Sequence, residues 1–171
     1  MSEPHFHSTE EIESFASRVR EASSAGIVLL LDGEEMLELA RSHGYDDLNL
    51  IHEGGRTYAY SEQHMTRPYA ELGVRASSGD LLHAIAETVR SDSATYPRPT
   101  SVALFSEKPF RFTAEQLDTA VQAFATDPQY DDIRLVVASD GSRFLFSSKH
   151  LDAAHAASLA EWHSVGRFNN P

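Results

Sequence analysis

The sequence contains no cysteine among its 171 residues. This absence excludes disulfide bonds, thiolate zinc sites, iron–sulfur clusters and cysteine nucleophiles. Long apolar runs are also missing, because the longest, residues 25–31, is far shorter than the roughly 20 residues that cross a bilayer. The first residues carry neither a basic nor an apolar segment, so we expect no signal peptide and a cytoplasmic location.

Positive charge is scarce, with 14 Lys and Arg against 26 Asp and Glu and a formal net charge of −12. Such a charge repels phosphate backbones and anionic lipid surfaces, so we expect neither a nucleic-acid nor a membrane partner. A protein partner with a basic patch fits this charge best. Hydrophobic residues make up 41% of the chain and charged residues 23%, which is typical of a globular protein.

The sequence also lacks the familiar cofactor and catalytic motifs. It has no P-loop, no G-x-G-x-x-G, no H-E-x-x-H and no G-x-S-x-G. Its nine histidines are scattered and show no spacing typical of a metal site. We therefore expect no cofactor, no metal and no catalytic residue.

What the sequence does contain is an internal similarity. Residues Tyr45–Ile51 (YDDLNLI) are echoed by Tyr130–Val136 (YDDIRLV). A glycine turn follows each copy, and then come Tyr58–Ser61 (YAYS) and Phe144–Ser147 (FLFS). A histidine lies three residues after each of these serines. We interpret the two stretches as copies of one unit.

The flanking patterns extend this similarity. A capping-box spacing at Ser8 begins one helix and Asp80 begins its counterpart; each leads to a short apolar run predicted as a strand, 27–31 and 102–105. Second helices are predicted at about 34–42 and from Thr113 to just before Pro128. Glycine turns then predict a hairpin in each copy, with alternating Ile133, Leu135 and Val137 on one face.

We expect closing helices at about 62–72 and 148–163, capped by Ser61 and Ser147, the first shortened or kinked at Pro68. Each copy is thus α–β–α–β–β–α. The fold class we predict is α+β: two tandem pseudo-repeats with antiparallel β-hairpins, packed as one globule. The predicted divisions are residues 8–76 for the first unit, 79–163 for the second and 164–171 for a C-terminal tail.

Aromatic side chains complete the predicted core. Tyr58, Tyr60, Phe144 and Phe146 alternate along the hairpin strands and are expected inside, because few basic residues accompany them as a nucleic-acid surface would require. Trp162 is expected to close the core near the last helix.

One candidate site deserves testing, although helix capping is the simpler interpretation of its serines. Ser147, His150 and Asp152 supply the groups of a catalytic triad, and Ser61 with His64 repeats part of it. A pocket between the two copies would bring together Ser61, His64, Ser147, His150, Asp152 and His155. The acidic pairs 46–47 and 131–132 are interpreted as turn residues that limit edge pairing, with spatial pairing across the copies left open.

Three functional hypotheses follow. The first is a non-catalytic protein-interaction or accessory subunit that acts through an acidic surface. The second is a small-molecule sensor or an enzyme whose pocket lies between the copies. The third rests on helix-then-hairpin order, which resembles the second half of a winged helix. That resemblance implies an acidic tandem winged-helix-like regulator that binds protein rather than DNA, because acidic Glu34, Glu35 and Glu38 would face the DNA.

Overall fold

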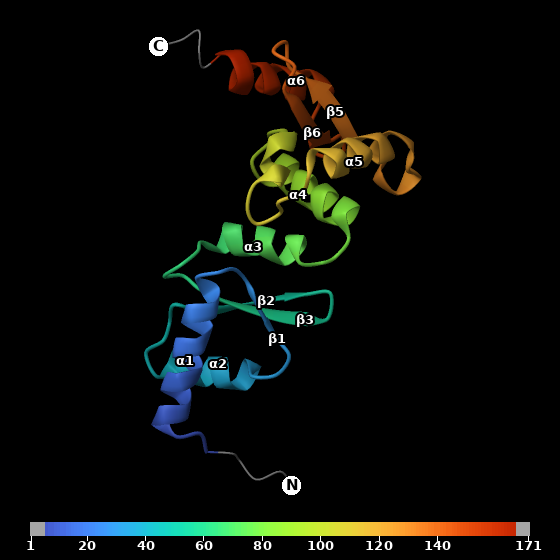
Figure 1. Ribbon diagram of the computed structural model, residues 1–171. Helices are drawn as coiled ribbons and strands as arrows, with labels where there is room; N and C mark the ends of the chain where they lie inside the picture. Colours follow the sequence, from blue (N-terminus) through green and yellow to red (C-terminus); the bar gives the residue numbers. More distant parts are fainter. Residues whose placement is uncertain (1–5, 167–171) are drawn as a thin grey trace. The chain divides into compact units, whose positions relative to one another are not determined.

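The computed structural model describes residues 6–166, and these form helices and antiparallel sheets of the α+β class (Figure 1). The chain divides into two compact units, residues 1–74 and 75–171. Each unit is described below by itself. The expected packing of both into one globule stays a prediction.

The first unit holds one three-stranded sheet and the helices around it. Its strands lie in the order β1-β3-β2, and both pairings are antiparallel. Gly54 and Gly55 make the β2–β3 turn with φ of +60° and +75°, which glycine adopts without steric cost. The elements are α1 (Thr9–Ser23), β1 (Val28–Leu30), α2 (Glu34–Ser42), β2 (Leu48–Glu53), β3 (Arg56–Ser61) and α3 (Arg67–Ala76).

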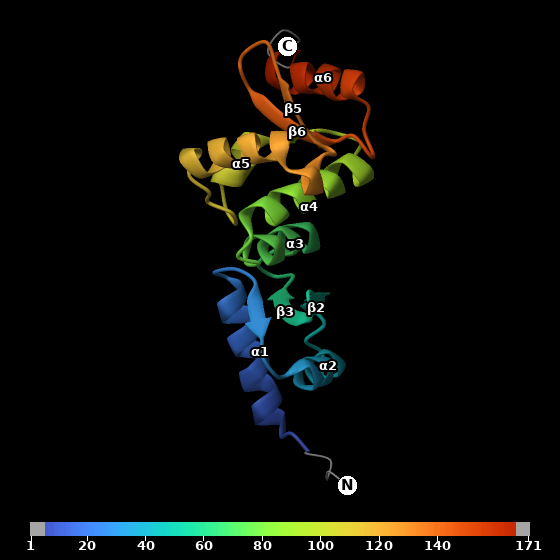
Figure 2. The ribbon, with the colours of Figure 1, turned by 90° about the vertical axis from the view of Figure 1, so that its right-hand side faces the viewer.

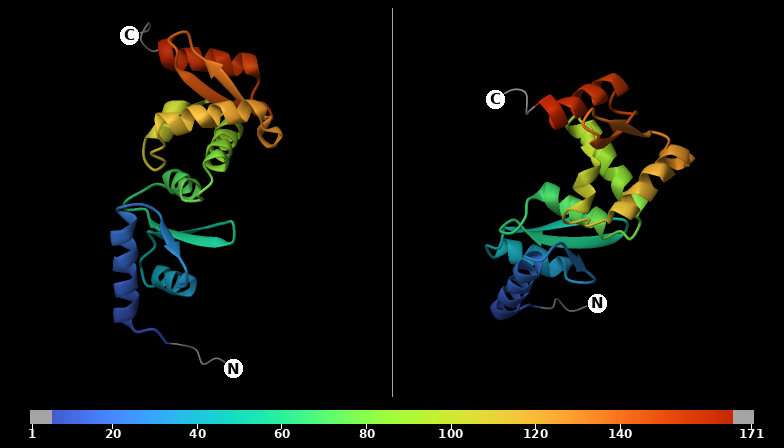
Figure 3. Two further views of the ribbon diagram at one scale, coloured as in Figure 1. Left: turned by 45° about the vertical axis from the view of Figure 1, so that its right-hand side comes forward. Right: turned by 45° about the horizontal axis from the view of Figure 1, so that its top comes forward.

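Both faces of this sheet are covered, because successive strand residues point to opposite sides. Leu48 and Ala59 pack with α1 and α2. Tyr58 and Tyr60 belong to a separate cluster with α3. The β2–β3 hairpin accordingly lies between α3 and the pair α1 and α2 (Figure 3).

The second unit also contains a three-stranded antiparallel sheet, in the order β4-β6-β5. Helix α6 covers the face that carries Phe144 and Phe146, while α4 and α5 contact the hairpin from the other side (Figure 2). The elements are α4 (Leu81–Thr95), β4 (Thr100–Ser101), the 3-10 helix η1 (Val102–Ser106), α5 (Ala114–Thr126), the 3-10 helix η2 (Pro128–Tyr130), β5 (Ile133–Val137), β6 (Arg143–Ser147), α6 (Ala153–Glu161) and the π-helical turn η3 (Trp162–Gly166).

Local signals in the sequence predicted several elements correctly. The capping box at Ser8 is present, and a second box joins Thr113 to Gln116 at the start of α5. Helix α2 has the predicted bounds. The four hairpin aromatics are buried, each at most 6% exposed.

The apolar run at residues 102–105 is not a strand, which corrects the prediction. It forms η1, and β4 lies just before it at residues 100–101. Val102 and Phe105 are three residues apart, the repeat of a 3-10 helix, and both are buried. Periodicity alone does not separate such a short apolar run from a strand.

The closing helices begin later than predicted, which is a second correction. Ser61 and Ser147 are the last residues of β3 and β6, and they do not cap a helix. Helix α6 is capped by Asp152. Pro68 lies in the first turn of α3, where its missing N–H costs nothing, so no kink results.

The shared strand face of Ile133, Leu135 and Val137 is only partly covered. Ile133 is buried, but Leu135 and Val137 are 45% and 54% exposed, and Val136 packs on the opposite face. One side chain expected in the core requires a correction. Trp162 is 53% exposed and does not close the core. Of the predicted tail, residues 164–166 belong to η3, and 167–171 lie outside the described residues.

Candidate functional site

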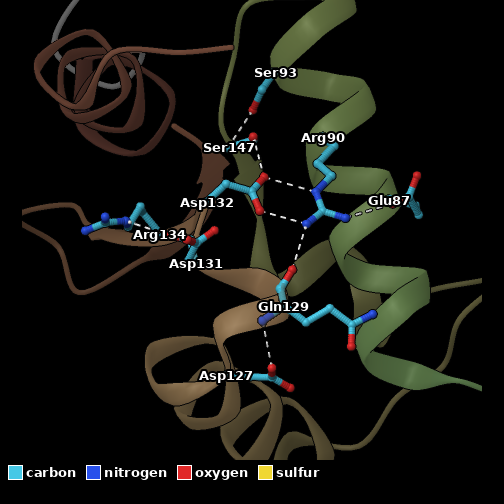
Figure 4. A network of polar contacts seen from close by, with 9 residues as sticks. All are labelled: Glu87, Arg90, Ser93, Asp127, Gln129, Asp131, Asp132, Arg134 and Ser147. Atoms are coloured by element: carbon cyan, nitrogen blue, oxygen red, sulfur yellow. Dashed lines mark hydrogen bonds and ion pairs between the residues drawn. The ribbon is translucent and has the colours of Figure 1, made fainter. Parts of the chain in front are cut away.

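A buried polar network ties the β5–β6 hairpin to α4 (Figure 4). Arg90 donates two hydrogen bonds to the Asp132 carboxylate, from Nε at 3.0 Å and from Nη2 at 2.7 Å. The hydroxyl of Ser147 donates to the same carboxylate at 2.7 Å. The backbone N–H of Ser147 in turn donates to Ser93 Oγ at 3.0 Å.

The electrostatics of this network favour the charged forms of both ion-pair partners. The hydrogen bonds from Arg90 lower the pKa of Asp132 to about 2, against desolvation that acts to raise it, and the Ser147 hydroxyl lowers it further. Asp132 raises the pKa of Arg90 in return. The guanidinium also bonds Glu87 at 2.9 Å and lies 5.7 Å from the centre of the Tyr130 ring.

The same arrangement occurs in the first unit. Arg20 Nε donates to Asp47 at 3.0 Å, and the Ser61 hydroxyl donates to that carboxylate at 2.6 Å. The N–H of Ser61 donates to Ser23 Oγ at 2.8 Å. The hydrogen bonds from Arg20 lower the pKa of Asp47, and the arginine lies 4.9 Å from the ring of Tyr45.

The contacts of these networks give them a structural role. The proton of the Ser147 hydroxyl points to a carboxylate whose pKa is about 2, which is too weak a base to activate a nucleophile. The backbone carbonyl of Asp132 also accepts from Ser148 N–H at 2.8 Å. Each network therefore fixes the end of a hairpin to the first helix of its unit.

The structure places the six predicted site residues in different surroundings. Ser61 and Ser147 are fully buried in the two networks. His64 and His150 are exposed in the turns after them, and among the described residues no hydrogen bond joins either ring to a serine.

Asp152 and His155 lie together at the start of α6. The Asp152 carboxylate accepts from the N–H of His155 at 3.2 Å, which is a helix cap, and the ring of His155 is exposed. Convergence of the two sets into one pocket stays a prediction.

The residues that do assemble were not predicted from the sequence; they include Arg20, Arg90, Ser23 and Ser93. The role of the second aspartate in each acidic pair was not predicted either. One sequence pattern does indicate these residues. Arg20 and Ser23 are spaced like Arg90 and Ser93, so an R-x-x-S motif ends the first helix of each unit. Its partners, Asp47 and Asp132, occupy matching places in the two Y-D-D motifs.

An open apolar groove lies beside β1 in the first unit. Its cavity measures about 770 Å³ and is bordered by α1, β1 and the start of α2. Leu29 is 45% exposed and Leu31 is 93% exposed. Asp32 and Glu35 are exposed acids at its border, which also includes Arg18 and His7.

The negative charge is concentrated in this unit. Residues 1–74 hold 14 Asp and Glu against 5 Lys and Arg, a formal charge of −9. Residues 75–171 hold 12 against 9, a charge of −3. Most of the acidity predicted to attract a partner thus belongs to the first unit.

The second unit has an apolar groove of its own, between α5 and β5. It measures about 580 Å³, and Val121, Phe124 and Leu135 contribute to its lining. It is bordered by the exposed cation Arg134 on β5.

Within residues 6–166, no group of three or more histidines, aspartates or glutamates is placed to hold a metal ion. No helix in that range is long and apolar enough to cross a membrane.

Comparisons with known proteins place the chain in a family. Residues 79–168 match the model described as the YdhW C-terminal domain. Over 176 aligned residues the chain is 33% identical to "Uncharacterized protein YdhW" of Escherichia coli (strain K12), covering 95% of this chain and 82% of that relative. No solved structure matches significantly. On both counts, the chain belongs to the YdhW family.

Proposed function

We propose that the chain is a cytoplasmic, non-catalytic accessory protein that binds another protein through the acidic surface of its first unit. The observation that carries this proposal is the coincidence of a −9 charge and an open apolar groove in residues 1–74. Apolar grooves bordered by charge are typical of protein-binding surfaces. The complementary partner presents Lys and Arg around apolar side chains.

The two buried networks support a binding role over a catalytic one. They occupy the hydroxyls of Ser61 and Ser147, the serines of the candidate triad, and they fix each hairpin to a helix. A well-fixed sheet beside an exposed groove favours protein binding, because little conformational entropy is lost when the partner binds.

The two units also support the inference of a tandem pseudo-repeat. Both contain a helix, an edge strand, a helix, a hairpin and a closing helix, with the hairpin's second strand central in each sheet. Both place an Arg–Asp–Ser–Ser network at the same point of that order. An experimental structure in which the two networks failed to superpose would contradict a common origin.

The test begins with affinity purification of the chain from its native organism at moderate salt after nuclease treatment. Mass spectrometry then names the stoichiometric partner. The decisive variant changes three exposed glutamates of the first unit, Glu13, Glu35 and Glu38, to Lys. We expect the affinity for that partner to fall by about tenfold or more.

The matched control makes the same charge change in the second unit, at exposed Glu107, Glu115 and Asp131. This variant should bind within about threefold of the wild type. Equal binding by the wild type and the first-unit variant would overturn the proposal.

A further inference from the structure

We propose that the free edge of β1 receives an extended segment of the partner as an added antiparallel or parallel strand, with basic and apolar side chains alternating along it. This inference rests on the proposed function and specifies the partner's chemistry. It commits to an unfolded or strand-forming segment of another protein.

The first support is the edge itself. Strand β1 pairs with β3 on one side, and no strand of the described residues pairs with its other side. Proteins commonly protect such edges with charged side chains, proline or a bulge. Val28–Leu30 and the following Leu31 supply none of these, and α1 runs beside the strand without adding a pairing partner (Figure 2).

The second support is the groove next to that edge. Side chains of an added strand alternate between two faces, so one set needs an apolar place to lie. Phe15, Val28 and Met36 border the cavity of about 770 Å³ and are only half-buried. Leu29 and Leu31 extend this apolar surface outward.

The third support is charge, which selects the occupant. Asp32 and Glu35 border the groove together with Arg18 and His7, in a unit whose formal charge is −9, so the excess of negative charge attracts a segment carrying Lys or Arg. A second copy of this unit would bring another −9 against it, which opposes pairing between identical edges.

The other sheet provides a contrast. Its outer strand β5 also exposes aliphatic side chains, Leu135 and Val137, but it carries the exposed Arg134 between Ile133 and Leu135. A cation on an edge strand is a common protection against strand addition. The β5 edge is therefore the matched control for β1.

The experiment uses the full ¹⁵N-labelled chain and a synthetic peptide of about eight residues with alternating Lys and Val. A second peptide has the same sequence with every other backbone nitrogen methylated, which removes strand hydrogen bonds and keeps the side chains. A third replaces Lys with Glu. Amide chemical shifts locate the binding, and titration measures the affinity.

We expect the Lys–Val peptide to shift the amides of residues 28–31. Methylation or exchange of Lys for Glu should weaken binding by about tenfold or more. The double variant Leu29→Lys, Leu31→Lys should weaken it similarly, while Leu135→Lys, Val137→Lys should leave it unchanged. Both variants change exposed side chains, and retained amide shifts for Ser61 and Ser147 confirm an intact fold.

Equal binding of the methylated peptide, perturbation confined to other strands, or no binding at millimolar peptide would each overturn strand addition. Binding of the native partner distinguishes failure of strand addition from failure of the proposed function. If the triple Glu→Lys variant no longer binds that partner while the Leu29→Lys, Leu31→Lys variant binds it fully, strand addition at β1 is wrong and binding through the acidic surface is supported. Retention in the Glu→Lys variant overturns the proposed function.

Discussion

At the scale of single residues, Asp132 carries the clearest energetic role. Asp132 is 3% exposed, and its carboxylate accepts hydrogen bonds from Arg90 and Ser147. The folded-state pKa of about 2 lies below the ordinary value of 3.8, so the ionised form stabilises the fold above about pH 4. That contribution is lost as the pH falls from 4 through 2.

We therefore expect Asp132→Asn to lower the free energy of unfolding at pH 7 by about 2 kcal/mol or more, because Arg90 loses its buried counter-charge and keeps only the more exposed Glu87. Urea titrations at several pH values should show the gap to the wild type narrowing between pH 4 and 2. The neighbouring exposed Asp131, changed to Asn, is the control and should cost under about 0.5 kcal/mol. A gap independent of pH would contradict this role.

Ser93 allows a second prediction, because its hydroxyl accepts the buried N–H of Ser147. Ser93→Ala leaves that N–H donor without a partner, so it should lower the free energy of unfolding by about 1–3 kcal/mol, as measured by denaturant titration. Ser106→Ala is the control, because the Ser106 hydroxyl is exposed and bonds only its own local turn. Equal stability of the two variants would show that the contact with Ser147 is replaceable.

At the scale of elements, caps set where the helices begin. The Thr113 hydroxyl oxygen accepts a hydrogen bond from the backbone N–H of Gln116, and Gln116 Oε1 accepts one from the backbone N–H of Thr113. Thr113→Ala should lower stability by about 1 kcal/mol, measured by thermal and urea unfolding. Thr119→Ala, exposed in the middle of α5, should be neutral or slightly stabilising; a similar loss there would argue against the cap.

Elements whose signals are local were the ones that the sequence predicted well. The capping box at Ser8, the N-cap at Thr113 and the turn at Gly54 and Gly55 depend on residues within one turn of each other. The strand predicted at Val102–Phe105 failed because a four-residue apolar run fits both a strand and a 3-10 helix.

At the scale of the whole molecule, the second unit is expected to fold by itself. Its sheet has helices on both faces, and the family match begins at residue 79. A fragment of residues 79–171 should unfold cooperatively in urea and show dispersed amide shifts. The same fragment with Asp132→Asn should unfold at lower urea. A fragment without a cooperative transition would show that the unit needs residues before it.

The candidate site shows which features could not be predicted from the sequence. Serines spaced three residues from histidines suggested Ser61 with His64 and Ser147 with His150, but the fold turns the serines inward and leaves the histidines exposed. The groove beside β1 was not predictable, because it depends on how α1, β1 and α2 are placed around it. The hydrophobic periodicity of the sequence does not specify how these three elements pack around the groove.

The helix caps at Ser8, Asp80 and Thr113, the glycine turns of both hairpins, the negative charge and the absence of thiol chemistry follow from the sequence, because each depends on neighbouring residues or on composition alone. The tertiary structure decided which aspartate of each pair is buried. Asp47 meets Arg20 and Asp132 meets Arg90 across separations of 27 and 42 residues. Such contacts form only once a helix and a hairpin pack together, since burying the carboxylate requires the cation and hydroxyl that arrive from elsewhere in the chain.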